Sequence, residues 1–356
     1  MHENKYIFTP GPVKMADEII SVGGKQTPYF RNREFSQVLL ECEQKLISFA
    51  NAPQGSRVIF LTGSGSAAME AAVINFFDSG RKHIVINGGG FGQRFVDIAQ
   101  LRQFDIYDVR PNLCNLSDVS GLDEYTDASV LCVNGHETSI GLLYDLDAIG
   151  RFCHSNGILN IVDAISLFVT DPIDMQKQFI DVLLIGSQKG LALDPGLSMI
   201  ILSPKAITQI QPTNSLYFGF QNYLKDGLRG QTPFTPAVSV ILQLHQRLNQ
   251  IEKHGITEEQ KKAREVAEYF RQAIKPLPLK AYTEYLPNAL TALTPTDDRK
   301  AGELVELLDK RYDVIVTPNG GPLADVVFRV SHMGDMNIEY IDHLINALYD
   351  IYGVKR

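Results

Sequence analysis

The sequence predicts an α/β protein with a mostly parallel sheet, followed by a smaller α+β region. In the first two thirds of the 356-residue chain, short β-branched segments alternate with longer amphipathic ones, which is typical of βαβ units. After Pro236 this alternation stops, and two long helical segments follow. The chain is also longer than one hydrophobic core usually allows, so two domains are expected.

Six strands are expected in the first region, with helical segments between most of them. They cover residues 58–62, 83–87, 129–134, 159–164, 181–187 and 199–203. The link before the last strand is too short for a crossover helix, so we expect that strand to run antiparallel to its neighbour.

The second region has the pattern of a small α+β domain. Two helical segments, 237–255 and 256–277, precede the strand-like segments NALTALTP and VVFRVSH and two further helical segments. We therefore expect an N-terminal arm at residues 1–16, a large domain at 17–253 and a small C-terminal domain at 254–356.

Composition narrows the class of protein. The chain has 33 basic and 41 acidic residues, a net charge of −8, which argues against nucleic acid or an anionic membrane as the main partner and favours a small molecule. The four cysteines (Cys42, Cys114, Cys132 and Cys153) are scattered and are expected to be reduced. No apolar run is long enough for a signal peptide or a membrane span, so a cytoplasmic protein is expected.

The segments after the strands are the ones to examine, because ligands of parallel α/β sheets bind at the carboxyl ends of the strands. After the first strand, Gly63-Ser64-Gly65-Ser66 leads into a helix, and small residues at a helix N-terminus can bind a phosphate. The alternative is a turn that only caps the helix. The pattern is neither a Walker P-loop nor a dinucleotide fingerprint.

The next two turns carry an aromatic ring and several polar groups. Phe91 lies in GGGFGQR, where its ring can stack on a planar ligand or simply anchor the loop. The turn 135–141 contains His136, Glu137 and Thr138 and either caps a helix or contacts a ligand. His136 and Glu137 lack a third metal ligand nearby, so no metal site is expected.

Asp163 ends one apolar strand, and Lys189 follows the next, in GSQKGLALDPG. Buried charges are costly unless they are paired or used, so the two residues form either a structural ion pair or part of a site. Together the strand ends supply an amine, a carboxylate, a phosphate turn, an aromatic ring and hydroxyls. Pyridoxal 5′-phosphate needs this set of groups.

The sequence resembles the class V aminotransferases, a family of fold-type I pyridoxal-phosphate enzymes. The matching segments span nearly the whole chain in the family's order: FTPGPV, GSGSAAMEAA, NGGGFGQR, HETSIGLL, IVDAISLF, GSQKGLALDPG and FRVSHMG. The resemblance is greatest to the alanine–glyoxylate, serine–pyruvate and 2-aminoethylphosphonate–pyruvate aminotransferase branch. It implies a large domain with a mostly parallel seven-stranded sheet, a smaller C-terminal α+β domain, and a homodimer with shared active sites.

The resemblance also implies a role for individual residues. Lys189 would form the Schiff base with the cofactor and later move the substrate proton, and Asp163 would pair with the pyridine nitrogen. Arg329 would bind the substrate carboxylate as a bidentate partner, near the backbone of Gly11. The other expected cofactor contacts are Ser64, Gly65, Ser66 and Gln188 at the phosphate, Thr138 at the ring oxygen, and Phe91 and Ile165 on the two ring faces.

Some expected contacts depend on the partner subunit or on the substrate. Gln231, Thr232 and Thr235 in GQTPFTPAV would reach the phosphate pocket of the partner. In QTPYFRNREF, phenylalanine replaces the histidine of the family's His-Arg pair, which leaves Arg31, with Arg33 nearby, either to bind a second anion of the substrate or to lie in solvent.

The expected activity is transfer of an amino group from a small donor, of the 2-aminoethylphosphonate, alanine or serine type, to pyruvate or glyoxylate by a ping-pong mechanism. The alternatives are a desulfurase or lyase on the same fold, or a degenerate binding module. A desulfurase needs a mobile cysteine in the small domain, and all four cysteines precede residue 154.

Overall fold

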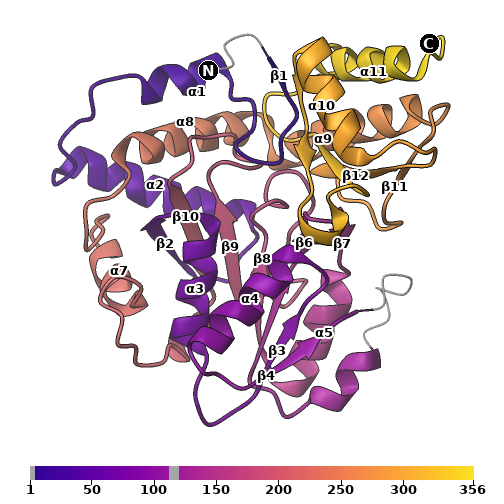
Figure 1. Cartoon of the computed structure of the whole chain (residues 1–356). Helices are drawn as coiled ribbons and strands as arrows, with labels where there is room; N and C mark the ends of the chain where they lie inside the picture. The colour runs from indigo at the N-terminus through magenta and orange to yellow at the C-terminus, as the bar shows by residue number, and fades with distance from the viewer. Residues whose placement is uncertain (1–4, 112–119) are drawn as a thin grey trace.

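The computed structural model describes residues 5–111 and 120–356 and has a seven-stranded sheet at its centre (Figure 1). This confirms the α/β class and the number of strands that the resemblance implied. In spatial order the strands are β2 (Arg57–Thr62), β10 (Leu197–Leu202), β9 (Val182–Gly186), β8 (Leu159–Asp163), β5 (Val130–Asn134), β3 (His83–Ile86) and β4 (Ile106–Val109).

The sheet is parallel except at β10, which pairs antiparallel with both β2 and β9. The expected antiparallel last strand is therefore confirmed. The edge strand β4 is the one that the sequence pattern did not reveal, because IYDV is only partly buried and contains a charged residue.

Helices cover both faces of the sheet, and alternate side chains of each strand enter two different cores. On β2, Val58 and Phe60 join the core with α2, α5 and α8, whereas Ile59 and Leu61 join the core with α3, α4 and α7. The helices of this part are α1 (Asp17–Gly23), α2 (Arg33–Phe49), α3 (Gly65–Phe76), α4 (Gly90–Leu101), α5 (Leu146–Asn156), α6 (Pro204–Thr208), α7 (Phe220–Gly227) and α8 (Val238–His254). A short hairpin, β6 (His136–Glu137) and β7 (Leu142–Leu143), follows β5.

The C-terminal part has a separate antiparallel sheet and a third core, seen at the upper right of Figure 1. Its sheet order is β11 (Leu279–Ala281), β12 (Leu290–Pro295), β15 (Phe328–Ser331) and β14 (Thr317–Pro318), and its helices are α9 (Ile256–Ala273), α10 (Ala301–Tyr312) and α11 (Ile338–Tyr352). The N-terminal strand β1 (Tyr6–Ile7) pairs with β13 (Val314–Ile315), and Phe8 is fully buried in this core. The arm thus packs on the C-terminal part.

The break between α8 and α9 is at Gly255, whose φ of 90° favours glycine. It lies next to the predicted domain boundary at 253/254, which stays a prediction.

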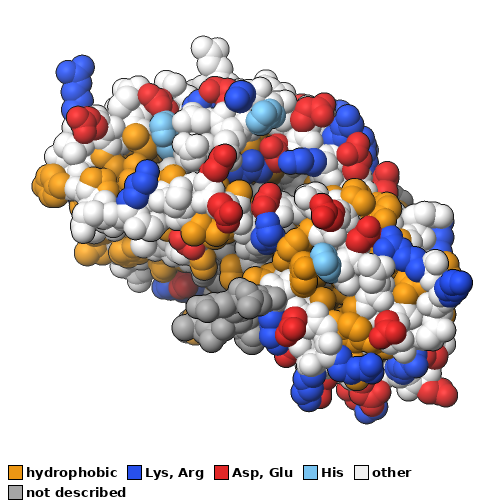
Figure 2. Space-filling model, turned by 90° about the horizontal axis from the view of Figure 1, so that it is seen from above, with side chains coloured by type: hydrophobic (Ala, Val, Ile, Leu, Met, Phe, Trp, Pro, Cys, Tyr) orange, Lys and Arg blue, Asp and Glu red, His pale blue; other side chains and the backbone are white. Residues whose placement is uncertain are grey.

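On the face shown in Figure 2, acidic and basic side chains are interspersed. Within residues 5–111 and 120–356, no helix is both long and apolar enough to cross a membrane. Cys42, Cys132 and Cys153 are buried and unpaired, and Cys114 lies outside the described residues.

Candidate active site

A solvent-open cavity of about 660 Å³ lies at the carboxyl ends of β5 and β8, where α3 and α4 begin. The structure brings together in its wall most of the residues that the sequence predicted: Gly11, Ser64, Gly65, Ser66, Phe91, Thr138, Asp163, Ile165, Gln188 and Lys189.

Asp163 is the buried carboxylate of this cavity and is only 6% exposed. The Ile165 amide donates to its Oδ1 over 2.8 Å, and Asn134 Nδ2 donates to its Oδ2 over 2.5 Å. Burial raises the pKa of Asp163 to about 6, while these two hydrogen bonds and the charge of Lys189 oppose the rise. Asp163 is therefore mostly a carboxylate at neutral pH, able to pair with a protonated ring nitrogen.

Lys189 is the amine of the cavity and follows β9 by three residues. Burial, together with the positive charge of Arg329, lowers the pKa of Lys189 to about 8. At pH 7 about one tenth of the Lys189 side chains are thus unprotonated, far more than for a lysine of ordinary pKa, and the unprotonated amine is the nucleophilic form.

Gly11 lies against the Lys189 side chain. Its φ is 141°, and a Cβ at this position would be 2.8 Å from Lys189 Cδ and Cε. A side chain here would displace the end of the Lys189 side chain, and the backbone conformation itself favours glycine.

Asp163 and Lys189 both face the cavity but form no ion pair with each other. This observation argues against the structural ion pair that the sequence left open. A ligand with an electron-poor ring between the two groups can use both at once.

The turn before α3 fits an anion. Ser64 is exposed, and its side chain makes no capping hydrogen bond, so the first N–H groups of a 12-residue helix lack a side-chain cap at the cavity. A Cβ on Gly65 would be 2.3 Å from Ile165 Cδ1, so the close packing of Ile165 on this turn requires glycine.

Glu137 supports the wall rather than binding a metal. Its carboxylate is fully buried and accepts hydrogen bonds from the Phe91 and Gly92 amides and from Ser139. It thereby caps α4 and fixes the loop that carries Phe91. The sequence showed only a polar turn here, because its partners are far away along the chain.

His136 is a second residue whose environment the sequence did not reveal. It is buried in the cavity wall, with Nδ1 2.9 Å from Ser166 Oγ, and Nε2 has no partner. Burial and the charges of Lys189, Arg271 and Arg329 hold its pKa well below the usual value, so the ring is neutral.

Arg329, on β15, does not line the cavity, but its charge acts on Lys189 and His136 in the cavity wall. Its guanidinium donates to the carbonyl oxygens of Thr138 (3.4 Å) and Pro318 (3.0 Å), and its buried Nε has no partner. Burial lowers the pKa of Arg329, and the charge of Glu137 opposes this shift. An incompletely satisfied guanidinium at this point can still bind a carboxylate.

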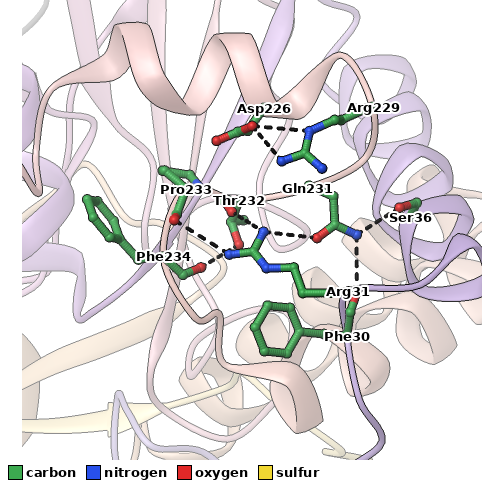
Figure 3. A network of polar contacts seen from close by, with 9 residues as sticks. All are labelled: Phe30, Arg31, Ser36, Asp226, Arg229, Gln231, Thr232, Pro233 and Phe234. Atoms are coloured by element: carbon green, nitrogen blue, oxygen red, sulfur yellow. Dashed lines mark hydrogen bonds and ion pairs between the residues drawn. The ribbon is translucent and has the colours of Figure 1, made fainter.

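The remaining predicted residues do not line this chain's own cavity. Figure 3 shows the polar contacts that hold Arg31. Arg31 donates to Gln231 Oε1 (3.1 Å) and to the Thr232 carbonyl oxygen (2.7 Å). It is thus neither a free surface arginine nor part of the cavity. Arg33 is exposed at the start of α2, and Thr235 lines an open groove.

The donor set fits pyridoxal 5′-phosphate, which supplies an aldehyde, a basic ring nitrogen and a phosphate. The cavity offers an amine of lowered pKa, a buried carboxylate and an uncapped helix N-terminus. A fold of this type with these groups at its strand ends defines a pyridoxal-phosphate enzyme.

Comparison with known proteins gives the family. Residues 24–335 match the model of the aminotransferase class-V family. The soluble hydrogenase 42 kDa subunit of Anabaena cylindrica is 29% identical over 349 residues, covering 94% of this chain and 89% of that protein. The alanine–glyoxylate aminotransferase of Oryctolagus cuniculus is 27% identical over 361 residues, covering 97% and 92%.

Among solved structures, an alanine–glyoxylate aminotransferase from Nostoc sp. superposes with a TM-score of 0.89 at 23% identity, covering 98% of this chain and 95% of that one. This likeness concerns the fold. The match of the family model shows that the chain belongs to the class V aminotransferases, and it is a transaminase that depends on pyridoxal phosphate.

Proposed function

We propose that the chain moves an amino group from a small primary amine, of the 2-aminoethylphosphonate, alanine or serine type, to pyruvate or glyoxylate. The observation that carries this proposal is the shared cavity of Lys189 and Asp163, which face the same space without pairing with each other. Donor and acceptor occupy this cavity in turn, so the kinetics are ping-pong.

The two residues have complementary tasks. When bound, pyridoxal 5′-phosphate withdraws electrons from the carbon that bears the substrate amine and holds the amino group between the half-reactions. Lys189 Nζ attaches the cofactor and, once released, takes the proton from that carbon. The Asp163 carboxylate keeps the ring nitrogen protonated, and Asn134 and the Ile165 amide hold that carboxylate in place.

Substrate carboxylate binding is assigned to Arg329 with the Gly11 backbone. This suits alanine, serine, pyruvate and glyoxylate, which all carry a carboxylate next to the reacting carbon. For 2-aminoethylphosphonate, which has no α-carboxylate, Arg329 would hold the phosphonate or serve only the acceptor. Support for this substrate class comes from relatives named alanine–glyoxylate aminotransferases.

We include a homodimer in the proposal. Gln231 and Thr232 do not line the chain's own cavity and are linked to Arg31, which supports a role for this group at the site of the partner subunit. Next to it is a mainly apolar groove lined by Thr27, Pro28, Tyr29, Phe30 and residues 235–240, in which Tyr29 is 70% exposed. An open apolar groove of this kind is typical of a protein interface.

A desulfurase is less well supported. Cys42, Cys132 and Cys153 are buried, none of them lines the cavity, and burial raises the pKa of each thiol. Buried thiols of raised pKa are poor nucleophiles.

Single half-reactions test the proposal. The cofactor-loaded chain is mixed with each amine in turn, and conversion to the pyridoxamine form is followed by absorbance. Alanine, serine or 2-aminoethylphosphonate should convert it, and pyruvate or glyoxylate should reverse the change. If no primary amine converts it, transamination of these substrates is wrong.

A further inference from the structure

Arg94 is a cation in the cavity wall to which neither the sequence nor the proposed mechanism gave a task. It lies in the first turns of α4 and is exposed. Among the described residues, no carboxylate is within ion-pairing distance of its guanidinium. The neighbouring arginines differ: Arg102 pairs with Glu70 at 2.8 Å, and Arg110 pairs with Asp108 at 3.1 Å.

The contacts of Arg94 aim it at the turn before α3. Its Nη1 donates to Ser66 Oγ over 2.7 Å, and its guanidinium lies 5.0 Å from the centre of the Phe91 ring. Ser66 belongs to the turn whose helix N-terminus lacks a side-chain cap. A guanidinium and an uncapped helix N-terminus thus meet at one end of the cavity, and both favour an anion.

A second arginine, Arg329, does not line the cavity, but its charge acts on Lys189 there, and it is available for a different anion. Arg329 donates to the Thr138 and Pro318 carbonyl oxygens, whereas Arg94 donates to Ser66, so the two guanidinium groups have different partners. Since Arg329 is assigned to the substrate carboxylate, the anion nearest Arg94 is the one on the Ser64–Ser66 turn. A phosphate there would carry close to two negative charges, and a guanidinium would add positive charge to the two seryl hydroxyls and the helix dipole.

We propose that Arg94 binds the phosphate group of the cofactor, together with Ser66 and the N-terminus of α3. This inference rests on the proposed cofactor site. Arg94 bridges Phe91 and Ser66, so it also links the residue expected to stack on the ring to the residue expected to hold the phosphate. The contact supplies charge from the chain itself, independently of a partner subunit.

The experiment compares two ligands that differ only in the phosphate. Pyridoxal phosphate and pyridoxal are titrated into the cofactor-free full chain and its Arg94→Gln variant, and dissociation constants are taken from absorbance. Loss of one charge-assisted contact at an exposed site should weaken pyridoxal phosphate about tenfold. Pyridoxal, which forms the same bond to Lys189, should change by less than about twofold.

Two further variants and a competitor complete the test. Arg94→Lys keeps the charge and should recover part of the affinity. Arg102→Gln, at the other end of α4 and paired with Glu70, should bind both ligands like the parent chain. Inorganic phosphate should slow cofactor binding to the parent chain at lower concentrations than it does for Arg94→Gln.

The results that would overturn the inference are distinct. Equal losses for both ligands would mean that Arg94 acts through Phe91 and the ring, and no loss for either would mean that it has no part in binding. A change only in the KM of an amino donor would assign it to a substrate anion. If the parent chain itself failed to bind pyridoxal phosphate, the proposed function would fail instead.

Discussion

Asn134 donates a hydrogen bond from Nδ2 to Asp163 Oδ2 over 2.5 Å, across the ends of two adjacent parallel strands. The two residues are direct register partners of β5 and β8. The strand register itself thus places the Asn134 amide beside the Asp163 carboxylate, and this hydrogen bond does not depend on the conformation of a loop.

Replacing Asn134 with alanine should move the pH dependence of the reaction. Asp163 would lose a hydrogen bond to its charged form, which is one of the groups that keep its pKa from rising above about 6. The acid limb of kcat/KM should therefore move up by roughly one pH unit. Asn156→Ala, which removes only a local contact to the Phe152 carbonyl oxygen, is the control. An unmoved acid limb would show that Asn134 does not set the charge state of Asp163.

The cofactor-free chain should become less stable between pH 4 and pH 7 because of Asp163. Its folded pKa, about 6, lies above the ordinary 3.8, so the folded state holds the proton more tightly, and the stability gained is lost as the pH rises through 6. The loss is up to about 3 kcal/mol. Urea unfolding of Asp163→Asn at these pH values should show a smaller decrease than the parent chain does.

The matched control for this measurement is Asp171. Burial also raises the pKa of Asp171 to about 6, but this residue does not line the cavity. Asp171→Asn should also flatten the pH profile but should retain cofactor binding. If the stability of Asp163→Asn fell with pH as steeply as that of the parent chain, the raised pKa assigned to Asp163 would be wrong.

Glu137→Ala should destabilise the chain by roughly 2–3 kcal/mol, because the N–H groups of Phe91, Gly92 and Ser139, buried or partly buried, would lose their acceptor. Glu137→Gln keeps one acceptor oxygen and should lose less. Both variants should alter the absorbance of the bound cofactor, since the Phe91 loop is no longer fixed. Thermal unfolding and spectra measure these effects, and Glu70→Ala is the surface control. Equal stability of parent and Glu137→Ala would rule out the capping role.

Gly11→Ala should block the attachment of the cofactor with little effect elsewhere. The new Cβ would strike the Lys189 side chain at 2.8 Å, and a φ of 141° is strained for alanine. We expect the rate of cofactor binding to fall at least about tenfold, because strained backbone of this kind costs about 1–3 kcal/mol and each 1.4 kcal/mol corresponds to a factor of ten. Gly24→Ala, whose Cβ meets nothing closer than 3.7 Å, is the matched control. Rapid attachment in Gly11→Ala would mean that Lys189 is not confined there.

The sequence predicted the residues whose signal is local. Asp163 and Lys189 each follow an apolar strand, and the Ser64–Ser66 turn precedes a helix, so their common edge follows from the parallel sheet alone. The six strands predicted for the large sheet all appeared, whereas its edge strand β4 was not predicted, because its edge position removes the apolar pattern.

The supporting contacts were not visible in the sequence, because they join segments far apart along the chain. Glu137 reaches the Phe91 loop 46 residues away, and Arg94 reaches Ser66 28 residues away. For Arg31 the sequence left open either a substrate anion or solvent. In the structure its guanidinium instead donates to a loop about 200 residues further along the chain. Such partners depend on tertiary packing, which no local pattern encodes.

The central claim is that Lys189 carries the cofactor, and borohydride reduction tests it most directly. Reduction of the cofactor-loaded chain makes the covalent bond permanent, and mass spectrometry of its peptides then locates the added phosphopyridoxyl group. We predict the group on Lys189 in the parent chain and no permanent attachment in Lys189→Ala. Attachment to another lysine, or none in the parent chain, would contradict the account.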